Sequence, residues 1–159
     1  MIISDATTII TLINIDEFNL LKLFTKKVIL PTEVYDEVVL NVDAEKHLLH
    51  QIEQKFVEVL TYKNEVIFSE LNIILDRGES AAITLAIENK RPLIIDEKKG
   101  RAIAKQLEVE IIGLIGILRF LYLEKKLNKD QTQIIIDKLN KSSFRISKSL
   151  IKIILDEKH

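Results

Sequence analysis

Short apolar runs rich in β-branched residues alternate along the chain with longer segments in which apolar residues recur every three or four positions. The short runs are typical of buried strands, and the longer segments have the period of amphipathic helices. The predicted strands are 2–4, 27–30, 56–60, 92–96 and 108–112. The predicted helices are 7–14, 17–25, 32–40, 44–54, 65–75, 79–89, 98–107, 114–126, 131–140 and 148–156. This alternation predicts an α/β protein with a five-stranded, mostly parallel sheet and helices on both faces.

One domain is enough to account for residues 1–159. A hydrophobic fraction of 47% with only two prolines and four glycines is typical of a compact, element-rich protein and argues against disorder. No linker rich in glycine, serine or proline divides the chain. Residues 128–159 follow the last predicted strand and are expected to form a helical C-terminal extension of that domain.

The composition also limits the compartment and the kind of metal site. The absence of cysteine excludes a disulfide framework and a thiolate metal site, and it fits a reducing cytosol. The apolar run IIGLIGIL is too short to cross a bilayer, and the apolar start of the chain lacks a basic region and carries Asp5. We therefore expect a cytoplasmic protein with no membrane partner.

A net charge of −1 gives no global sign of nucleic-acid binding, so such a partner would have to be held locally. One local candidate is a basic stretch without acids, and a solvated helix face with its preceding loop is the commoner explanation of such a stretch. Its basic residues are Lys138, Lys141, Arg145, Lys148 and Lys152.

Two acidic residues stand at the ends of predicted strands. Asp5 follows Ile-Ile-Ser, and Asp96 ends the run Leu-Ile-Ile-Asp. Ligands of open parallel sheets bind outside the carboxyl ends of the strands, at the point where strand order reverses. If the first and fourth strands are neighbours there, the two acids meet across one strand spacing of about 4.8 Å. Taken singly, each acid is better explained as a helix N-cap.

Two further acids stand near the same predicted edge. Glu37 borders the apolar face of helix 32–40, and Glu79 opens a helix whose alanines allow close packing on the sheet. A surface ion pair or the helix dipole explains either residue alone. A converging set of carboxylates, however, needs a cation or shared protons. Because oxygen ligands suit Mg²⁺ or Mn²⁺, such a set favours a metal site.

The ordered set of four acids, in SDATTIITL, PTEVYDEV, GESAAITLA and IIDEKKGRAIA, resembles the PIN-domain family of metal-dependent nucleases. The resemblance covers roughly residues 1–125. The ending FRISKSLIKIIL is similar to the C-terminal extension of a small prokaryotic PIN-like subgroup related to VapC-type toxins. The resemblance implies a three-layer α/β/α sandwich with sheet order 3-2-1-4-5, an acidic pocket for Mg²⁺ or Mn²⁺, and hydrolysis of RNA phosphodiester bonds.

The resemblance also assigns roles by position. Asp5 and Asp96 become the principal metal ligands and catalytic residues, and Glu37 and Glu79 complete the site directly or through water. Glu97 stands where many relatives carry a second aspartate, and its longer side chain leaves its direction open.

Other residues are expected at the edges of this site. The hydroxyl of Thr7, like Glu97, is expected to line the pocket. Lys98, Lys99 and Arg101 are candidate RNA contacts, although the solvent face of a helix explains them as well.

The function implied is that of a metal-dependent endoribonuclease acting as the toxin of a toxin–antitoxin pair. A cognate antitoxin and a homodimer are the partners that go with this function. The apolar helices 7–14 and 114–126 are candidates for a dimer interface, although both are also needed for the core. The alternative is a catalytically weak or inactive PIN-like module that binds nucleic acid or a protein partner.

Other classes fit less well. A phosphatase or receiver-like enzyme is disfavoured because no second aspartate stands two positions after Asp5, and a Rossmann cofactor site is disfavoured because no G-x-G-x-x-G follows the first strand. His47 and His50 are spaced for a metal site, but without further ligands a polar surface pair is the better interpretation, and we assign neither a role.

Overall fold

Five parallel strands run through the middle of the computed structural model, which describes residues 1–158. They are ordered β3-β2-β1-β4-β5, so the chain builds the sheet outward in one direction from β1 and then in the other direction from β4. The predicted fold class and the sheet order implied by the resemblance are both confirmed. The strands are β1 (Ile2–Ser4), β2 (Val28–Pro31), β3 (Val57–Leu60), β4 (Leu93–Ile94) and β5 (Ile111–Ile112).

The register fixes which residues follow one another at the carboxyl edge. Ser4 pairs with Ile94, and the next backbone N–H, that of Asp5, still donates to the Ile94 carbonyl at 2.9 Å. β5 is shorter than the predicted 108–112. The backbone N–H groups of Glu108 and Val109 still close the preceding helix on the carbonyls of Lys105 and Ala104, so those two residues do not belong to the strand.

The helices predicted from the apolar periodicity are all present, with ends shifted by a few residues. The described helices are α1 (Ala6–Asn14), α2 (Asn19–Phe24), α3 (Thr32–Val38), α4 (Val42–Glu53), α5 (Glu65–Leu71), α6 (Arg77–Asn89), α7 (Lys98–Gln106), α8 (Leu114–Leu123), α9 (Lys129–Lys141) and α10 (Lys148–Ile154).

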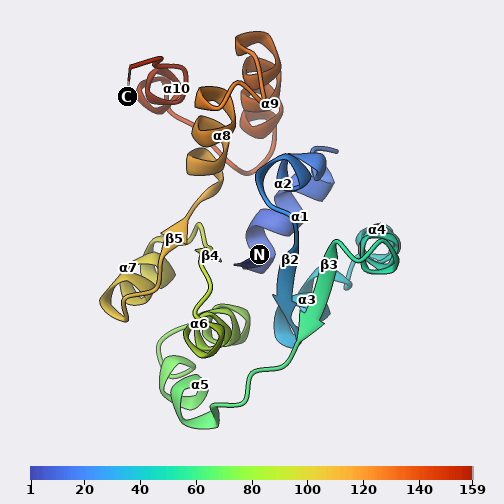
Figure 1. Ribbon diagram of the computed structural model, residues 1–159, viewed down its shortest axis with the longest axis vertical. Coiled ribbons are helices and arrows are strands. Elements are labelled where there is room, and N and C mark those ends of the chain that lie inside the picture. Colours follow the sequence, from blue (N-terminus) through green and yellow to red (C-terminus); the bar gives the residue numbers. More distant parts are fainter. Residues whose placement is uncertain (159) are drawn as a thin grey trace.

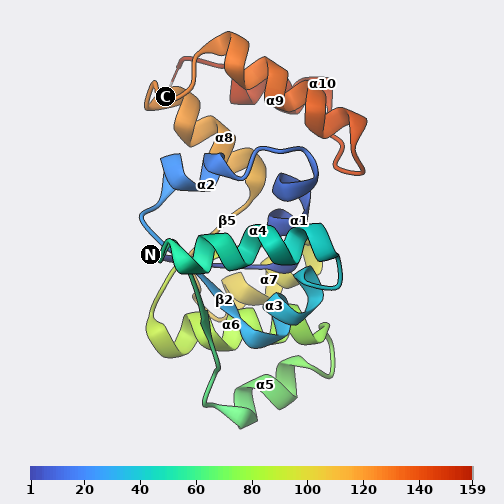
Figure 2. The ribbon, with the colours of Figure 1, turned by 90° about the vertical axis from the view of Figure 1, so that its right-hand side faces the viewer.

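Alternate strand residues enter two hydrophobic clusters, one on each face of the sheet. Ile2 and Ile94 belong to the cluster that also holds buried side chains of α1–α4 and α8–α10, whereas Ile3, Leu93 and Ile95 join those of α5, α6 and α7. This alternation is the period of two that strands impose. The result is a three-layer arrangement, with α5 and α6 at one end of the molecule and α8–α10 at the other (Figures 1 and 2).

The last two helices share the core of the larger cluster. Ile136 and Ile154 are fully buried in that cluster, and the Arg119 side chain of α8 donates to the carbonyls of Asp156 and Lys158 at 3.0 and 3.1 Å. The C-terminal segment is therefore held both by apolar burial and by hydrogen bonds to α8. Within residues 1–158, no helix combines the length and apolarity needed to cross a membrane.

Truncating the buried side of α9 tests this packing. We expect Ile136→Ala to lower the free energy of unfolding by about 2–5 kcal/mol, because it removes a fully buried side chain from the core. Ile134→Ala is the matched control on the same helix. Ile134 is 55% exposed, so its loss should change stability by no more than about 0.5 kcal/mol. Urea unfolding measures both, and equal losses would show that α9 is not part of the cooperative core.

Candidate metal centre

Asp5 joins β1 to β4 at the carboxyl edge of the sheet. Its side chain is 4% exposed, and each of its oxygen atoms accepts a backbone hydrogen bond. Oδ1 accepts from the N–H of Thr8 at 3.0 Å, and Oδ2 accepts from the N–H of Asp96 at 3.0 Å. Asp5 is therefore both the N-cap of α1 and the residue that meets Asp96 across neighbouring strands.

The carboxylate of Asp96 is fixed from two other directions. Its Oδ1 accepts from the N–H of Leu114 at 3.0 Å, at the start of α8, and its Oδ2 accepts from the Thr8 hydroxyl at 2.6 Å. Gly113 makes room for this arrangement, since a Cβ there would lie 2.7 Å from Asp96 Oδ1 and 2.8 Å from Arg101 Nη1. The orientation of Asp96 thus depends on a hydroxyl and on the absence of a side chain.

The threonine that contacts the acids is Thr8. Thr8 is fully buried, whereas Thr7, which the resemblance places at the pocket, is exposed. Successive residues of a helix point about 100° apart, so a shift of one position decides which hydroxyl faces Asp96.

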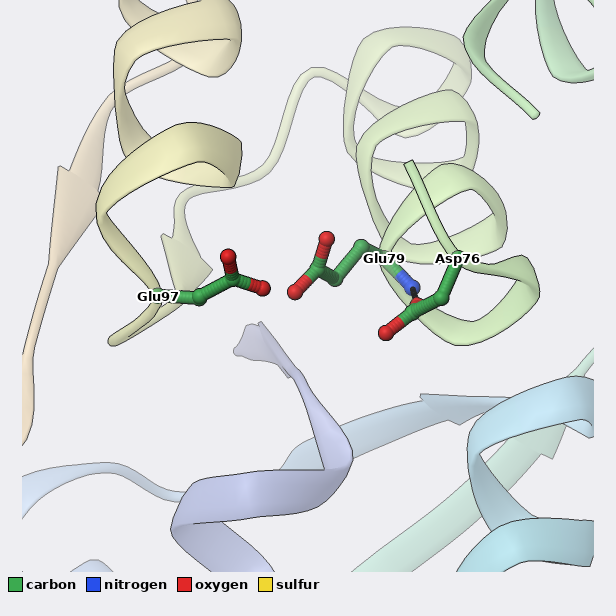
Figure 3. A group of neighbouring side chains, drawn as sticks. All are labelled: Asp76, Glu79 and Glu97. Carbon is green, nitrogen blue, oxygen red and sulfur yellow. Dashed lines mark hydrogen bonds between the residues drawn. The ribbon is translucent and has the colours of Figure 1, made fainter. Parts of the chain in front are cut away.

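A second group of acids lies beside this pair. Within residues 1–158, Asp76, Glu79 and Glu97 each place one carboxylate oxygen within 4.8 Å of the others. Figure 3 shows Glu97, from the start of α7, and Glu79, from the first turn of α6, pointing toward one another, with Asp76 alongside. The direction of Glu97, which the sequence left open, is therefore toward Glu79 (Figure 3).

Asp76 is a member of this group that the sequence analysis missed. Its Oδ1 accepts from the N–H of Glu79 at 2.8 Å, so it is the N-cap of α6. The available signal was the spacing Asp-x-x-Glu at the start of a helix, which places a capping residue and a first-turn glutamate close together.

Glu37 stands at the outer side of the group. Its Oε2 lies 3.2 Å from where a Cβ of Gly78 would be, and it lines a cavity of about 420 Å³ together with Asp76. Partial burial, and then the charge of Asp76, raises the pKa of Glu37 above its usual range. The charge of Asp76 therefore acts on Glu37 at the α3 side, but Glu37 does not belong to the group of Asp76, Glu79 and Glu97.

Burial and mutual repulsion hold protons on this site. Burial first, and then the charge of Asp96, raises the pKa of Asp5 from 3.8 to about 6, against the lowering effect of its hydrogen bonds. Burial, a side-chain hydrogen bond with Glu97 and the charge of Asp76 raise the pKa of Glu79 from 4.5 to about 8. Near neutral pH, Glu79 therefore keeps its proton.

The donor set fits a hard divalent cation. It consists of carboxylate oxygens alone, which suits Mg²⁺ or Mn²⁺ and does not suit the nitrogen- and sulfur-preferring metals. Acids that are buried together and repel one another are stabilised by a bound cation. Such a cation would displace the proton of Glu79 and offset the repulsion between the carboxylates. Asp76, Glu79 and Glu97 are the residues placed to hold such an ion, with Asp5 near enough for its charge to act on Glu79.

The basic residues predicted beside the site divide into two kinds. Arg101 donates from Nη1 to the carbonyl of Ile95 at 2.8 Å, so part of its guanidinium supports the strand that precedes Asp96. Lys98 and Lys99 are exposed at the start of α7, next to Glu97. Their contact with RNA stays a prediction.

Two other candidates from the sequence lie elsewhere. In the basic stretch 138–152, Lys138 pairs with Glu17 at 2.8 Å, and Arg145 donates to the Asn140 carbonyl. His47 was expected to be half of a surface pair, but it is partly buried against Phe18, with ring centroids 4.6 Å apart. Its apolar neighbour, invisible in the local sequence pattern, explains the difference.

Removing the Thr8 hydroxyl tests the support of Asp96. We expect Thr8→Val to lower the free energy of unfolding by about 1–3 kcal/mol, because it deprives a carboxylate oxygen of a buried donor while keeping the shape of the side chain. Thr7→Val, the same change at the exposed neighbour, should cost no more than about 0.5 kcal/mol. Chemical unfolding of both variants measures these losses in stability. A larger loss of stability for Thr7→Val would contradict the assignment of Thr8 as the residue that supports Asp96.

The raised pKa values predict how stability depends on pH without metal. A carboxyl whose pKa is higher in the folded state binds more protons folded than unfolded, so the free energy of unfolding falls as pH rises between the two values. The window runs from 3.8 to about 6 for Asp5 and from 4.5 to about 8 for Glu79. Glu79→Gln should therefore flatten the decline between pH 6 and pH 8.

Urea unfolding in EDTA across this pH range measures the effect. Glu53→Gln, at the exposed end of α4, is the matched control and should keep the decline of the parent protein. A parent protein whose stability is constant or rises between pH 6 and pH 8 would show that Glu79 is not protonated in the folded state.

Comparison with known families agrees with this geometry. A family model described as a PIN domain matches residues 1–159. No curated protein and no solved structure gives a match. The family match covers both the strand-end acids and the C-terminal helices, and the sheet order is the one that the resemblance implied. The chain therefore belongs to the PIN-domain family.

Proposed function

We propose that this protein is a Mg²⁺- or Mn²⁺-dependent ribonuclease that hydrolyses RNA phosphodiester bonds. PIN domains are generally nucleases, so the class of reaction is supported by the family. The observation that carries the proposal is the position of Asp76, Glu79 and Glu97 beside the joined pair Asp5 and Asp96. All five side chains lie at the carboxyl edge of the sheet, where parallel α/β proteins bind their ligands.

Some of these acids are held in a fixed orientation, and others are placed to bind a cation. Each oxygen of Asp5 and Asp96 already accepts one hydrogen bond, so these two carboxylates are fixed in direction and still have lone pairs for further ligands. Glu79, Glu97 and Asp76 supply the closest group of oxygens for an ion. A bound divalent ion would offset phosphate charge and lower the pKa of a bound water.

The protonation of Glu79 makes cation binding at this site depend on pH. Its pKa of about 8 means that it keeps a proton near neutrality until a cation takes the place of that proton. Glu97 places a carboxylate oxygen within 4.8 Å of Glu79, so both glutamates would be next to an ion bound there. Glu37 and Thr7 stay as proposed outer members of the pocket.

The proposed biological role rests on the resemblance of the C-terminal segment to a small prokaryotic PIN-like subgroup related to VapC-type toxins. We propose that the enzyme is the toxin of a toxin–antitoxin pair, acting in the cytoplasm, with a cognate antitoxin as its protein partner and a homodimer as its assembly. Exposed apolar side chains near α3 and α5, among them Leu40 at 85% and Ile73 at 83% exposure, offer surface for a protein partner.

RNA cleavage tests the activity directly. Purified protein with Mn²⁺ or Mg²⁺ should cleave members of a mixed panel of single-stranded and structured RNAs, and EDTA should abolish cleavage. Asp96→Asn should reduce the rate by at least about 100-fold, because the substitution removes the charge that the site needs. An asparagine can still accept from the Leu114 N–H and donate to the Thr8 hydroxyl, so the fold should survive the change.

Asp130→Asn is the matched control, since Asp130 is exposed at the start of α9, away from the acidic group. It should cleave RNA like the parent protein. Metal binding, followed as a shift in melting temperature, separates the outcomes. A protein that binds Mn²⁺ but cleaves nothing on the panel would favour a binding module, and cleavage that persists in EDTA would contradict the proposal.

A further inference from the structure

One cation next to the acidic group has no role in the site described so far. Arg77 is the first residue of α6, between the capping residue Asp76 and the buried Glu79, and its side chain is exposed. A cation at the positive end of a helix dipole does not stabilise the helix, which favours acids there. Its presence at this position therefore calls for an explanation outside α6.

Arg77 is held by aromatic rings. Its guanidinium carbon lies 5.6 Å from the centroid of the Phe68 ring, and Phe68 in turn stacks on Tyr62 with centroids 4.5 Å apart and planes 15° from parallel. Phe68 is buried in α5, which packs on α6. The ring of Phe68 thus holds the guanidinium of Arg77 by a cation–π contact at the edge of the acidic group.

Acidic residues surround Arg77 without pairing with it. The cavity of about 420 Å³ at the α3 side is lined by Glu33, Asp36, Glu37 and Asp76 together with Arg77. Within residues 1–158, the Arg77 guanidinium makes no ion pair and no hydrogen bond with any of them. Its five N–H donors are therefore available to a ligand, beside a site that is otherwise negative.

The Tyr62 hydroxyl adds a second donor. Tyr62 follows β3 at the same carboxyl edge of the sheet, and the charge of Arg77 acts on its hydroxyl. Burial, and then the charges of Glu65 and Glu33, raises the pKa of Tyr62, so the hydroxyl keeps its proton. In the described part of the chain this hydroxyl makes no hydrogen bond.

We propose that Arg77 and the Tyr62 hydroxyl form a phosphate-binding subsite that holds the RNA backbone beside the acidic group. The inference rests on the proposed ribonuclease function. Arginine recognises phosphate through paired N–H groups, and one anchored phosphate next to a repulsive acidic centre keeps the strand in place. With Lys98 and Lys99 on the α7 side, the subsite gives the RNA a contact on each flank of the acids.

RNA binding, separate from cleavage, tests the subsite. The probe is a short, fluorescently labelled single-stranded RNA of mixed sequence, and its anisotropy is followed in Mg²⁺ over a series of salt concentrations. All proteins carry Asp96→Asn, so that the RNA stays intact. We expect Arg77→Gln to weaken binding about five- to tenfold, as the loss of one charge-assisted phosphate contact does. It should also reduce the slope of log K against log salt by about 0.7.

Two further variants make the test specific. Tyr62→Phe keeps the aromatic stack and removes the hydroxyl, so it should weaken binding about two- to fivefold and leave the salt slope unchanged. Arg91→Gln is the matched control. Arg91 is exposed beyond the far end of α6, roughly 20 Å from Arg77 along the helix, and its loss should change affinity by less than about twofold.

The outcomes distinguish the subsite from the nuclease. If the parent binds RNA and Arg77→Gln binds with the same affinity and salt slope, the subsite is wrong and the proposed function stands. Equal losses for Arg77→Gln and Arg91→Gln would also overturn it, because they would report net charge alone. A parent that binds no RNA at any salt concentration would overturn the subsite together with the proposed function.

Discussion

The carboxylate of Asp5 joins the two strands on which the site depends. One of its oxygens closes the first turn of α1, and the other accepts the N–H of Asp96 at the end of β4. This contact exists only because strand order reverses between β1 and β4, which makes neighbours of segments that are far apart in sequence. Asp96 then extends the connection to α8 through the N–H of Leu114. Two acidic side chains thereby fix the relative positions of two strands and two helices.

The same hydrogen bonds separate the acids into two kinds. Asp5 and Asp96 are oriented by the backbone and by Thr8, and their positions are part of the fold. In the part of the chain that the structure describes, neither Glu79 nor Glu97 accepts a backbone N–H with its side chain. One carboxylate oxygen of each glutamate instead lies within 4.8 Å of the other. The fixed acids therefore define the edge of the site, and the glutamates are the members that can exchange a proton for a cation.

The sequence predicted most of this arrangement, and its failures have physical causes. Asp5 and Asp96 were identified because a strand that ends on an acid is visible in a local pattern. The choice of Thr8 over Thr7 depends on the rotation of α1 relative to β4, which the apolar period does not fix to one residue. Asp76 was missed, and the direction of Glu97 was left open, because the two residues belong to the ends of different helices. Only the packing of α6 and α7 on the same face of the sheet brings them together.

The concentration of acids at one edge is tolerated because the fold directs positive dipole ends at it. α1, α6, α7 and α8 all begin beside these carboxylates, so their unpaired N–H groups favour negative charge there. The compensation is incomplete, since burial, and then the neighbouring charges, still raise the pKa of Glu79 to about 8 and that of Asp5 to about 6. The remaining repulsion between the carboxylates favours the binding of a cation. Parallel strand order creates that preference, because it collects strand ends and helix starts at one edge and places the acids of both in the same small volume.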